Sequence, residues 1–229
     1  MFDGIARDYD LFERVFTFGQ AERWKMEVVE KLDVPRDSWV MDLGTGTADI
    51  AIRIAKELGC QVLAVDQSDE MIEVARRKVN ASDMSNRIRI LKGRAEDLPF
   101  HDASLDAVIF SYVLRYVEDV EATMREIIRV IKRDGQIIYL DFGIPTNPAI
   151  KAIYTVYARH ILPLGGWLGG QAWRATTEFL PSSIAKFYDE NSIPQLIKMW
   201  DGLGLRDVEV TTMTLGTAVI ISARRKAKC

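Results

Sequence analysis

The chain has 229 residues, of which 48% are hydrophobic and 28% charged, and its formal net charge is −3. This length suits one α/β domain with appended segments, and this composition excludes a disordered chain. The acidic balance argues against nucleic acid as a partner, because phosphate binding needs a concentrated basic surface.

Residues 1–34 are predicted to be helical, and an amphipathic run from Gln20 to Leu32 ends before Pro35. Beyond it, short apolar runs typical of strands alternate with helical patterns, which predicts a parallel sheet with right-handed crossovers. The predicted strands are Trp39–Leu43, Gln61–Val65, Ile88–Leu91, Leu105–Phe110 and Gln136–Leu140, and the helices among them are Asp49–Leu58, Ser68–Val79 and Val120–Lys132.

The segment from Asn147 to Asn191 breaks this alternation. It starts with a helical pattern, is then rich in Gly, Trp and Tyr, and has no clear place in the sheet, so we interpret it as an inserted cap. A helix from Ile193 to Leu203 follows it. Two further strands, Arg206–Met213 and Thr217–Ala223, then complete the sheet as an antiparallel edge pair.

These elements predict an α/β fold with a Rossmann-like, doubly wound, seven-stranded sheet, mostly parallel, plus N-terminal helices and a helical cap insertion. We treat residues 1–229 as one domain. Its parts are the N-terminal helices in 1–34, the ligand-binding core in 35–146, the cap in 147–191, and the last helix and edge strands in 192–229.

Two cysteines, Cys60 and Cys229, support neither a disulfide framework nor a cysteine-based metal site, so we expect no metal and a reducing, cytoplasmic setting. The N-terminus has acids where a signal peptide has basic and apolar segments, which implies no export. The apolar stretch from Ala152 to Gly170 is interrupted by Arg159 and Pro163. It is therefore not a spanning helix, and peripheral contact with a membrane surface stays open.

The strongest motif is Asp42-Leu43-Gly44-Thr45-Gly46-Thr47-Ala48-Asp49, in which a buried strand enters a glycine turn and then a helix. Gly44 and Gly46 let the backbone approach a ligand where a Cβ would clash, and the helix start presents N–H groups. A dinucleotide-binding fingerprint has glycine where this chain has Asp49, whose carboxylate would repel a pyrophosphate. The turn therefore suits S-adenosylmethionine, whose cationic sulfonium and ammonium groups favour Asp42 and Asp49.

Further polar residues follow the next strands. Asp66, with Gln67 beside it, ends the second strand, and its carboxylate can accept hydrogen bonds from both ribose hydroxyls. Arg94, Ala95 and Glu96 follow the third strand, where an adenine edge would lie. Open α/β sheets bind ligands at these strand ends. Together with the glycine turn, the chain resembles class I S-adenosylmethionine-dependent methyltransferases.

A closer resemblance covers nearly the whole chain and points to the ubiquinone and menaquinone biosynthesis C-methyltransferases. The segments similar to that family are Phe2–Asp10, Phe18-Gly19 with Trp24-Lys25, Leu114–Asp119, Arg129–Gly135, His160–Pro163 and Leu180–Ile184. The resemblance implies S-adenosylmethionine as cofactor, S-adenosylhomocysteine as product, and a lipophilic quinol as the small-molecule acceptor.

The resemblance also implies residue roles. Thr47, Asp66, the pair Arg94-Ala95 and Ser111 stand at the family's cofactor-contacting positions. Arg94 departs from the Asn or Asp usual there, and a guanidinium cannot accept a hydrogen bond from the adenine amino group. Adenine recognition is then expected to rest on the Ala95 backbone and Glu96.

Methylation of a ring carbon requires loss of a proton, so a base or an activated water is needed near the methyl group. The resemblance supports Arg115 as the catalytic centre, with Tyr9 and Asp49 as its hydrogen-bonding partners. The alternative is an arginine that is only ion-paired. The cap residues Tyr154, Tyr157, Trp167, Trp173 and Tyr188 could line an apolar acceptor pocket or belong to the core.

The chain departs from the family's usual residues at Ala21, Tyr116 and Ile144. These departures keep two other functions open: a methyltransferase for another small molecule or an amine, and a catalytically silent cofactor-binding partner protein. The sequence also leaves open whether the chain forms a homodimer.

Overall fold

Apolar side chains alternate along the central strands and give the sheet two buried faces. In β2 (Gln61–Asp66), Val62 and Ala64 join one apolar cluster, whereas Leu63 and Val65 join the other. This alternation is what a strand needs when helices cover both faces of its sheet. The computed structural model describes residues 4–227, so Phe2, Asp3, Lys228 and Cys229 lie outside the described residues.

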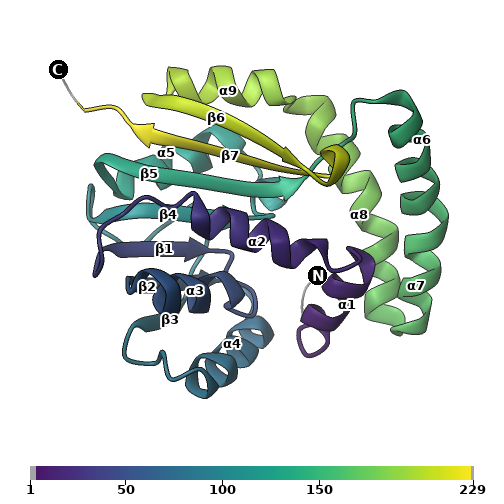
Figure 1. Ribbon diagram of the computed structural model, residues 1–229, viewed down its shortest axis with the longest axis horizontal. Helices are drawn as coiled ribbons and strands as arrows, with labels where there is room; N and C mark the ends of the chain where they lie inside the picture. Colours follow the sequence, from purple (N-terminus) through teal and green to yellow (C-terminus); the bar gives the residue numbers. More distant parts are fainter. Residues whose placement is uncertain (1–3, 228–229) are drawn as a thin grey trace.

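Within residues 4–227, one seven-stranded sheet has the order β3-β2-β1-β4-β5-β7-β6 (Figure 1). The strands from β3 to β5 are parallel, and β7 pairs antiparallel with both β5 and β6. This topology confirms the predicted fold class. The other strands are β1 (Trp39–Leu43), β3 (Ile88–Lys92), β4 (Leu105–Ser111), β5 (Ile131–Phe142), β6 (Leu205–Met213) and β7 (Ala218–Arg225).

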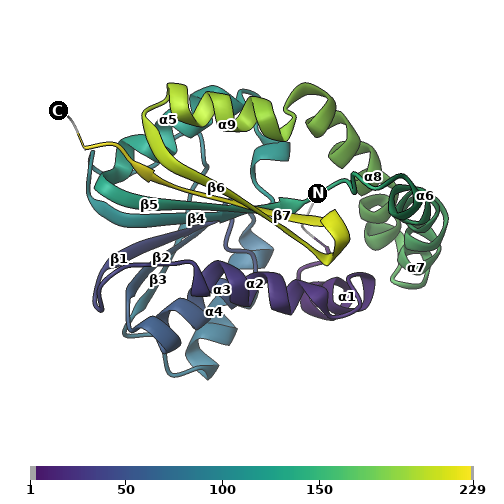
Figure 2. The same ribbon diagram turned by 45° about the horizontal axis from the view of Figure 1, so that its top comes forward.

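Helices cover the two faces of the sheet as separate layers (Figure 2). On one face lie α2 (Gln20–Glu30), α3 (Asp49–Arg53), the π-helical turn η1 (Ile54–Leu58) and α4 (Asp69–Ala81), and on the other lie α5 (Val120–Val130) and α9 (Ile193–Gly202). Trp24 and Val28 anchor α2 and are 3% and 0% exposed. The amphipathic face predicted for this helix is therefore buried.

The predicted cap is helical in nearly all of its length. It contains α6 (Pro148–Val156), the π-helical turn η3 (Tyr157–Ile161), α7 (Leu162–Leu168) and α8 (Gln171–Glu190), which continues through Pro181. With α1 (Tyr9–Phe16), these helices lie beyond the carboxyl ends of the parallel strands (Figure 1). The second half, which is rich in glycine and aromatic residues, is helical as well, and its glycines allow close packing between helices: an added Cβ at Gly166 would lie 2.0 Å from Thr177 Oγ1.

Two predicted helix ends differ from the structure. The helix expected to reach Lys132 ends at Val130, because Ile131 turns to an extended conformation and pairs with Leu105 of β4. The helix expected from Asp49 to Leu58 changes to a π-helical turn at Ile54. Three-residue 3₁₀ turns, η2 (Leu114–Tyr116) and η4 (Thr214–Gly216), complete the elements named here. Across residues 4–227, no helix is both long and apolar enough to cross a bilayer.

Candidate active site

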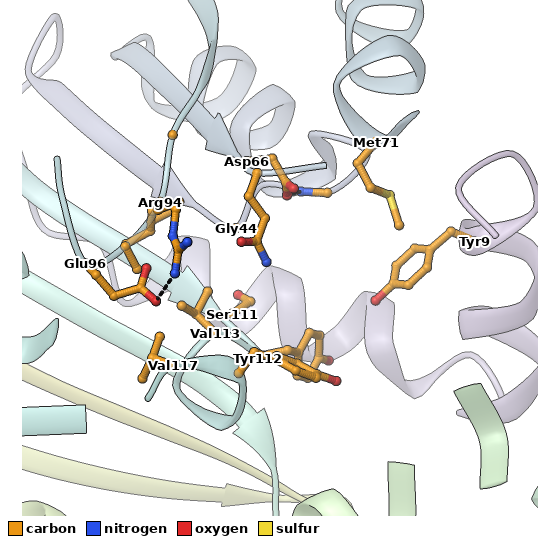
Figure 3. Close-up of a pocket in the computed structure, with 16 residues that line it drawn as sticks. Tyr9, Gly44, Asp66, Met71, Arg94, Glu96, Ser111, Tyr112, Val113 and Val117 are labelled. Carbon is orange, nitrogen blue, oxygen red and sulfur yellow. Dashed lines mark hydrogen bonds and ion pairs between the residues drawn. The ribbon is translucent and has the colours of Figure 1, made fainter. Parts of the chain in front are cut away.

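The carboxyl ends of β1 to β4 surround a pocket at the point where the strand order reverses, between β1 and β4 (Figure 3). We call it the strand-end pocket. The residues expected to contact a cofactor that line it are Gly44, Gly46, Asp66, Gln67, Arg94, Ala95, Glu96 and Ser111. Asp42, Thr45 and Thr47 line a smaller adjoining cavity instead.

The glycine turn brings bare backbone to this pocket. Gly44 has φ +71°, and an added Cβ would lie 2.5 Å from Val113 Cγ2 in the segment that follows β4. Gly46 has φ +55°, and an added Cβ would meet no protein atom within 4 Å. The first glycine is therefore required by packing, whereas the second leaves open space at the pocket wall.

Asp66 lies at the end of β2, where it lines the strand-end pocket and is hydrogen-bonded to the glycine turn. Its Oδ2 accepts a hydrogen bond from the Gly46 N–H at 2.8 Å, and its Oδ1 accepts one from the Ser68 N–H at 2.9 Å. A carboxylate has about four lone-pair sites, so it can hold the backbone and still accept from a ligand hydroxyl.

The end of the pocket opposite Tyr9 is formed by Arg94 and Glu96 (Figure 3). Arg94 Nη2 donates to Glu96 Oε1 at 3.1 Å, and the Arg94 side chain is 65% exposed. Burial would raise the pKa of Glu96, but Arg94 holds this pKa below its ordinary value. The Arg94 guanidinium is thus directed to Glu96, and Ala95 stands between them with its side chain buried.

The remaining wall suits a flat nucleobase and a cation. Met71, Val113 and Val117 supply apolar surface, and Asp66 and Glu96 supply negative charge. Among the described residues, Ser111 Oγ is a buried polar atom without a hydrogen-bond partner, as expected where a ligand completes the site. These residues fit an uncharged ribose, an adenine edge and a cationic sulfur, whereas a pyrophosphate would face carboxylates.

Asp42 is buried next to the glycine turn and is hydrogen-bonded within the protein. It is 1% exposed, and its Oδ2 accepts hydrogen bonds from Thr45 Oγ1 at 2.6 Å and from the Ala51 N–H at 3.1 Å. Burial raises the pKa of Asp42 to about 6. The carboxylate therefore fixes the glycine turn to the start of α3, and it lines the smaller cavity instead of the strand-end pocket.

Asp49 and Thr47 belong to a charged network between α1, α2, α3 and α4. Asp49 Oδ2 accepts from Lys25 Nζ at 3.0 Å, and Asp49 Oδ1 is paired with Lys78. Thr47 Oγ1 donates to Asp10 Oδ1 at 2.6 Å. Burial would raise the pKa of Asp49, but the two lysines outweigh it and keep this pKa below its ordinary value. The Asp49 carboxylate is therefore neutralised inside the protein.

A second, mostly apolar pocket lies between α1, the cap and the ends of β4 and β5. We call it the cap pocket. Tyr9, Tyr112 and Tyr116 line both pockets, so the two adjoin. Of the cap aromatics considered above, Tyr154, Tyr157 and Trp173 line it. Trp167 is 66% exposed, and Tyr188 instead donates to the Phe142 carbonyl at 2.8 Å.

Arg115 lies in the wall of the cap pocket, and its side chain is almost completely buried. Its Nε donates to Asp141 Oδ1 at 2.8 Å, with side-chain exposures of 1% and 0%. Tyr139 Oη and the Phe142 N–H also donate to Asp141, at 2.5 and 2.7 Å. Burial would lower the pKa of Arg115, but Asp141 raises it above its ordinary value. The guanidinium is therefore a fixed cation.

The expected partners of Arg115 need correction. Its Nη1 donates to Tyr116 Oη and Ser183 Oγ, both at 3.3 Å, and its Nε is taken by Asp141. No hydrogen bond joins it to Tyr9 or Asp49 within residues 4–227, because the Asp141 carboxylate from the neighbouring strand lies closer and Asp49 is held by lysines. Tyr9 still lines the same pocket.

The sequence analysis assigned no role in the site to two charged residues that the structure shows to be buried. Glu13 and Lys25, 8% and 6% exposed, form an ion pair between α1 and α2. A signal existed: Tyr9, Glu13 and Phe16 share one helix face, and a lone acid within an aromatic stripe is unusual. In residues 4–227, no group of three or more His, Cys, Asp or Glu could hold a metal ion.

The profile of the ubiE/COQ5 methyltransferase family matches residues 1–225. The chain belongs to this family. The UbiE ubiquinone/menaquinone biosynthesis C-methyltransferase of Geotalea daltonii is 30% identical over 227 residues, which are 98% of this chain and 94% of that protein. A demethylmenaquinone methyltransferase of Staphylococcus saprophyticus is 32% identical over 222 residues, or 96% of this chain and 92% of the relative.

Membership of the ubiE/COQ5 family confirms the predicted enzyme class, an S-adenosylmethionine-dependent methyltransferase. A solved S-adenosylmethionine-dependent methyltransferase from Aquifex aeolicus has the same fold, with a TM-score of 0.60 and 16% identity over 87% of this chain and 88% of that chain.

Proposed function

We propose that this enzyme methylates a ring carbon of a lipophilic quinol. The observation that carries the proposal is the pair of adjoining pockets, one lined by the residues that suit S-adenosylmethionine and the other by tyrosines and apolar side chains. Both relatives described above are named for quinone biosynthesis. S-adenosylmethionine supplies the methyl group, its sulfur keeps the electron pair of the broken C–S bond, and the ring carbon loses a proton.

The strand-end pocket would hold the cofactor by local contacts. Asp66 would accept from the ribose hydroxyls, as it already accepts from the Gly46 N–H. The Ala95 backbone and Glu96 would recognise adenine, with Met71 and Val113 against its ring. Ser111 and Tyr112, at the border with the cap pocket, would position the reacting end.

In the cap pocket, Arg115 would stabilise negative charge on the quinol oxygen. Its charge is fixed by Asp141, so it cannot accept a proton, but its remaining N–H groups can donate to an oxygen or to a water. Tyr9 would orient the ring at the junction of the two pockets. Asp49 lines neither pocket and would act through its lysine partners.

We further propose that residues 147–191 cap the acceptor and that the enzyme works at the cytoplasmic face of a membrane. Residues 147–170 contain Lys151 and Arg159 but no acid. Apolar side chains on α1, in the turn after it and in this segment are exposed: Leu11, Val15, Phe18, Ile153, Val156, Ile161, Leu164, Trp167 and Leu168. Apolar area with flanking cations favours an anionic bilayer surface, from which a lipophilic quinol would enter.

The acceptor is tested by labelling. Methyl-labelled S-adenosylmethionine should transfer its label to reduced 2-prenyl-1,4-naphthoquinone or to a reduced prenylated benzoquinone, and mass spectrometry should locate the label on a ring carbon. Label found only on amines, simple phenols or phospholipids would identify a different methyltransferase. Cofactor binding without any labelled product would identify the silent partner protein. Ala21 and Ile144 line neither pocket, whereas Tyr116 lines both, so two of the three departures leave the pocket walls unchanged, which favours catalysis.

The membrane surface is tested by co-sedimentation with vesicles that contain anionic lipid. The wild-type chain should sediment, and Trp167→Ser with Leu168→Ser should reduce binding severalfold, because each change removes exposed apolar area. Val210→Ser on β6, also at an exposed apolar position, is the matched control. Equal sedimentation of all three proteins would refute this surface.

A further inference from the structure

The carboxylate of Glu13 is buried in the wall of the cap pocket. Its side chain is 7% exposed, and it lines both the cap pocket and the small cavity beside the glycine turn. One of its oxygens, Oε2, is paired with Lys25. Within residues 4–227, the other oxygen, Oε1, is buried without a hydrogen-bond partner.

An unpartnered carboxylate oxygen in an apolar wall is costly, because it loses water without replacement. The cap pocket gathers more such atoms. Of the five buried side-chain N or O atoms without a partner among the described residues, three belong to residues that line it: Glu13 Oε1, Tyr112 Oη and Trp173 Nε1. Glu13 Oε1 can only accept a hydrogen bond, Trp173 Nε1 can only donate one, and Tyr112 Oη can do both. This set matches a ring that bears hydroxyl groups.

The charges around Glu13 keep it available as a base. Burial raises the pKa of Glu13, and Lys25 opposes this rise. The groups that influence it are Tyr9 and Asp10 on α1, Lys25 on α2, Asp49 on α3 and Tyr112 after β4. Efficient general bases have pKa values near the working pH, so a carboxylate with a raised pKa is suited to accept a proton.

The other ionisable groups of the pocket are poor bases. Burial raises the pKa values of Tyr9, Tyr112, Tyr116, Tyr154 and Tyr157, so their hydroxyls stay protonated. Arg115 stays cationic beside Asp141. Among the described residues that line the pocket, Glu13 is the carboxylate.

We propose that Glu13 Oε1 accepts a hydrogen bond from the acceptor's hydroxyl group and then takes its proton. The inference rests on the proposed quinol methylation. The O–H bond of the acceptor breaks, the proton binds Oε1, and the electron pair stays on the acceptor oxygen. That charge increases the electron density of the ring carbon that is methylated. After methyl transfer, the methylated ring carbon releases its proton to water, the electron pair of that C–H bond restores the aromatic ring, and Glu13 returns its proton to the product's oxygen.

A binding experiment tests the hydrogen bond without turnover. The probes are 2-prenyl-1-naphthol and its methyl ether, which has no proton to donate. The wild-type chain should bind the naphthol about tenfold or more tightly than the ether, since a hydrogen bond to a buried charge is lost with the ether. In Glu13→Gln the ratio of the two affinities should fall close to one. The amide oxygen should stay hydrogen-bonded to Lys25, so that the amide NH₂, which cannot accept a hydrogen bond from the naphthol, faces the pocket.

Glu22→Gln is the matched control, since Glu22 also pairs with Lys25, at 3.8 Å, but is 45% exposed and lines neither pocket. It should keep the wild-type ratio. An unchanged ratio in Glu13→Gln, or an equal fall in both variants, would overturn the proposal.

Turnover of reduced 2-prenyl-1,4-naphthoquinone tests the proton transfer. Glu13→Gln should lower kcat by about 10²–10⁴-fold and abolish the acidic limb of its pH profile, with cofactor affinity within about threefold. If Glu13 serves only to neutralise Lys25, a double variant with Glu13→Gln and Lys25→Met should recover the wild-type kcat. Such a recovery would refute the role of Glu13 as the base. If the wild type binds the naphthol preferentially through Glu13 but methylates no quinol, the function proposed above fails while the hydrogen bond stands.

Discussion

The two adjoining pockets are built in different ways. The strand-end pocket is formed mainly by short segments directly after β1, β2, β3 and β4, with Tyr9 of α1 and Met71 of α4 at its side. The cap pocket combines α1, α6 to α8 and the ends of β4 and β5, which are far apart in sequence. One pocket therefore depends on local turns, and the other on tertiary packing.

Their charges differ accordingly. Asp66 in the strand-end pocket holds backbone N–H groups, so its contacts form with the turn itself. In the cap pocket, Arg115 with Asp141 and Lys25 with Glu13 are buried ion pairs. Removal of one member of a buried pair leaves an uncompensated charge, whereas loss of a solvent-facing carboxylate does not. We expect substitutions to affect catalysis and folding on the acceptor side, and affinity on the cofactor side.

The largest effect is expected for Arg115→Ala. Turnover of the quinol should fall by about 10²–10⁴-fold, because a fixed cation next to the reacting oxygen is lost. Cofactor affinity should stay within about threefold, since Arg115 lines only the cap pocket of the two. Kinetics with the labelled cofactor and calorimetry measure the two quantities. An equal fall in turnover and in cofactor affinity would contradict the separate roles of the two pockets.

Arg115→Ala also leaves Asp141 unpaired, which should cost about 3–5 kcal/mol of unfolding free energy. The control is Arg115→Leu with Asp141→Leu, which removes both charges. Urea denaturation should show that the double variant recovers most of this stability, while its turnover stays low. Recovered turnover would show that the arginine serves folding only.

A smaller effect is expected for Asp66→Ala. Affinity for S-adenosylhomocysteine should fall by about 1–3 kcal/mol, because hydrogen bonds from a charged acceptor to the ribose are removed. Calorimetry measures this loss. Asp69→Ala, at a 77% exposed carboxylate near the same strand end, is the control. Equal affinities for wild type and Asp66→Ala would contradict the ribose contact and make the carboxylate a support of the turn alone.

The smallest effect concerns Asp42, the buried carboxylate under the glycine turn. Its pKa is raised by burial to about 6, so the folded state binds the proton more tightly than the unfolded state. The stability that this proton supplies is present below about pH 4 and is lost as the pH rises through about 6. Asp42→Asn cannot titrate, and its Oδ1 can accept both hydrogen bonds now made to Oδ2.

Between pH 4.5 and pH 7.5, the unfolding free energy of Asp42→Asn should therefore rise by about 1–2 kcal/mol relative to that of the wild type. Urea denaturation at the two pH values measures it. A shift of the opposite sign would mean that Asp42 is ionised in the folded state at acidic pH, as in a cation-binding site.

The same contrast explains which parts of the site could be predicted from the sequence. The glycine turn, Asp66 and the segment after β3 are local patterns, and the family profile covers them. The pair formed by Arg115 and Asp141 depends on β4 and β5 being neighbours in the sheet, which spacing does not reveal. The continuous helix α8 was missed because Pro181 and the glycines before it lower local helix propensity, while tertiary packing overrides them.

The position of β7 has a consequence for synthesis of the chain. β7 follows β6 in the sequence yet lies between β5 and β6, so the outer edge of β5 has no partner until residues 218–225 emerge from the ribosome. Ala218 and Val219 then pair with Phe142 and Asp141. The nascent chain can thus complete its glycine turn early, whereas this edge of β5 stays open to pairing with other chains until β7 docks.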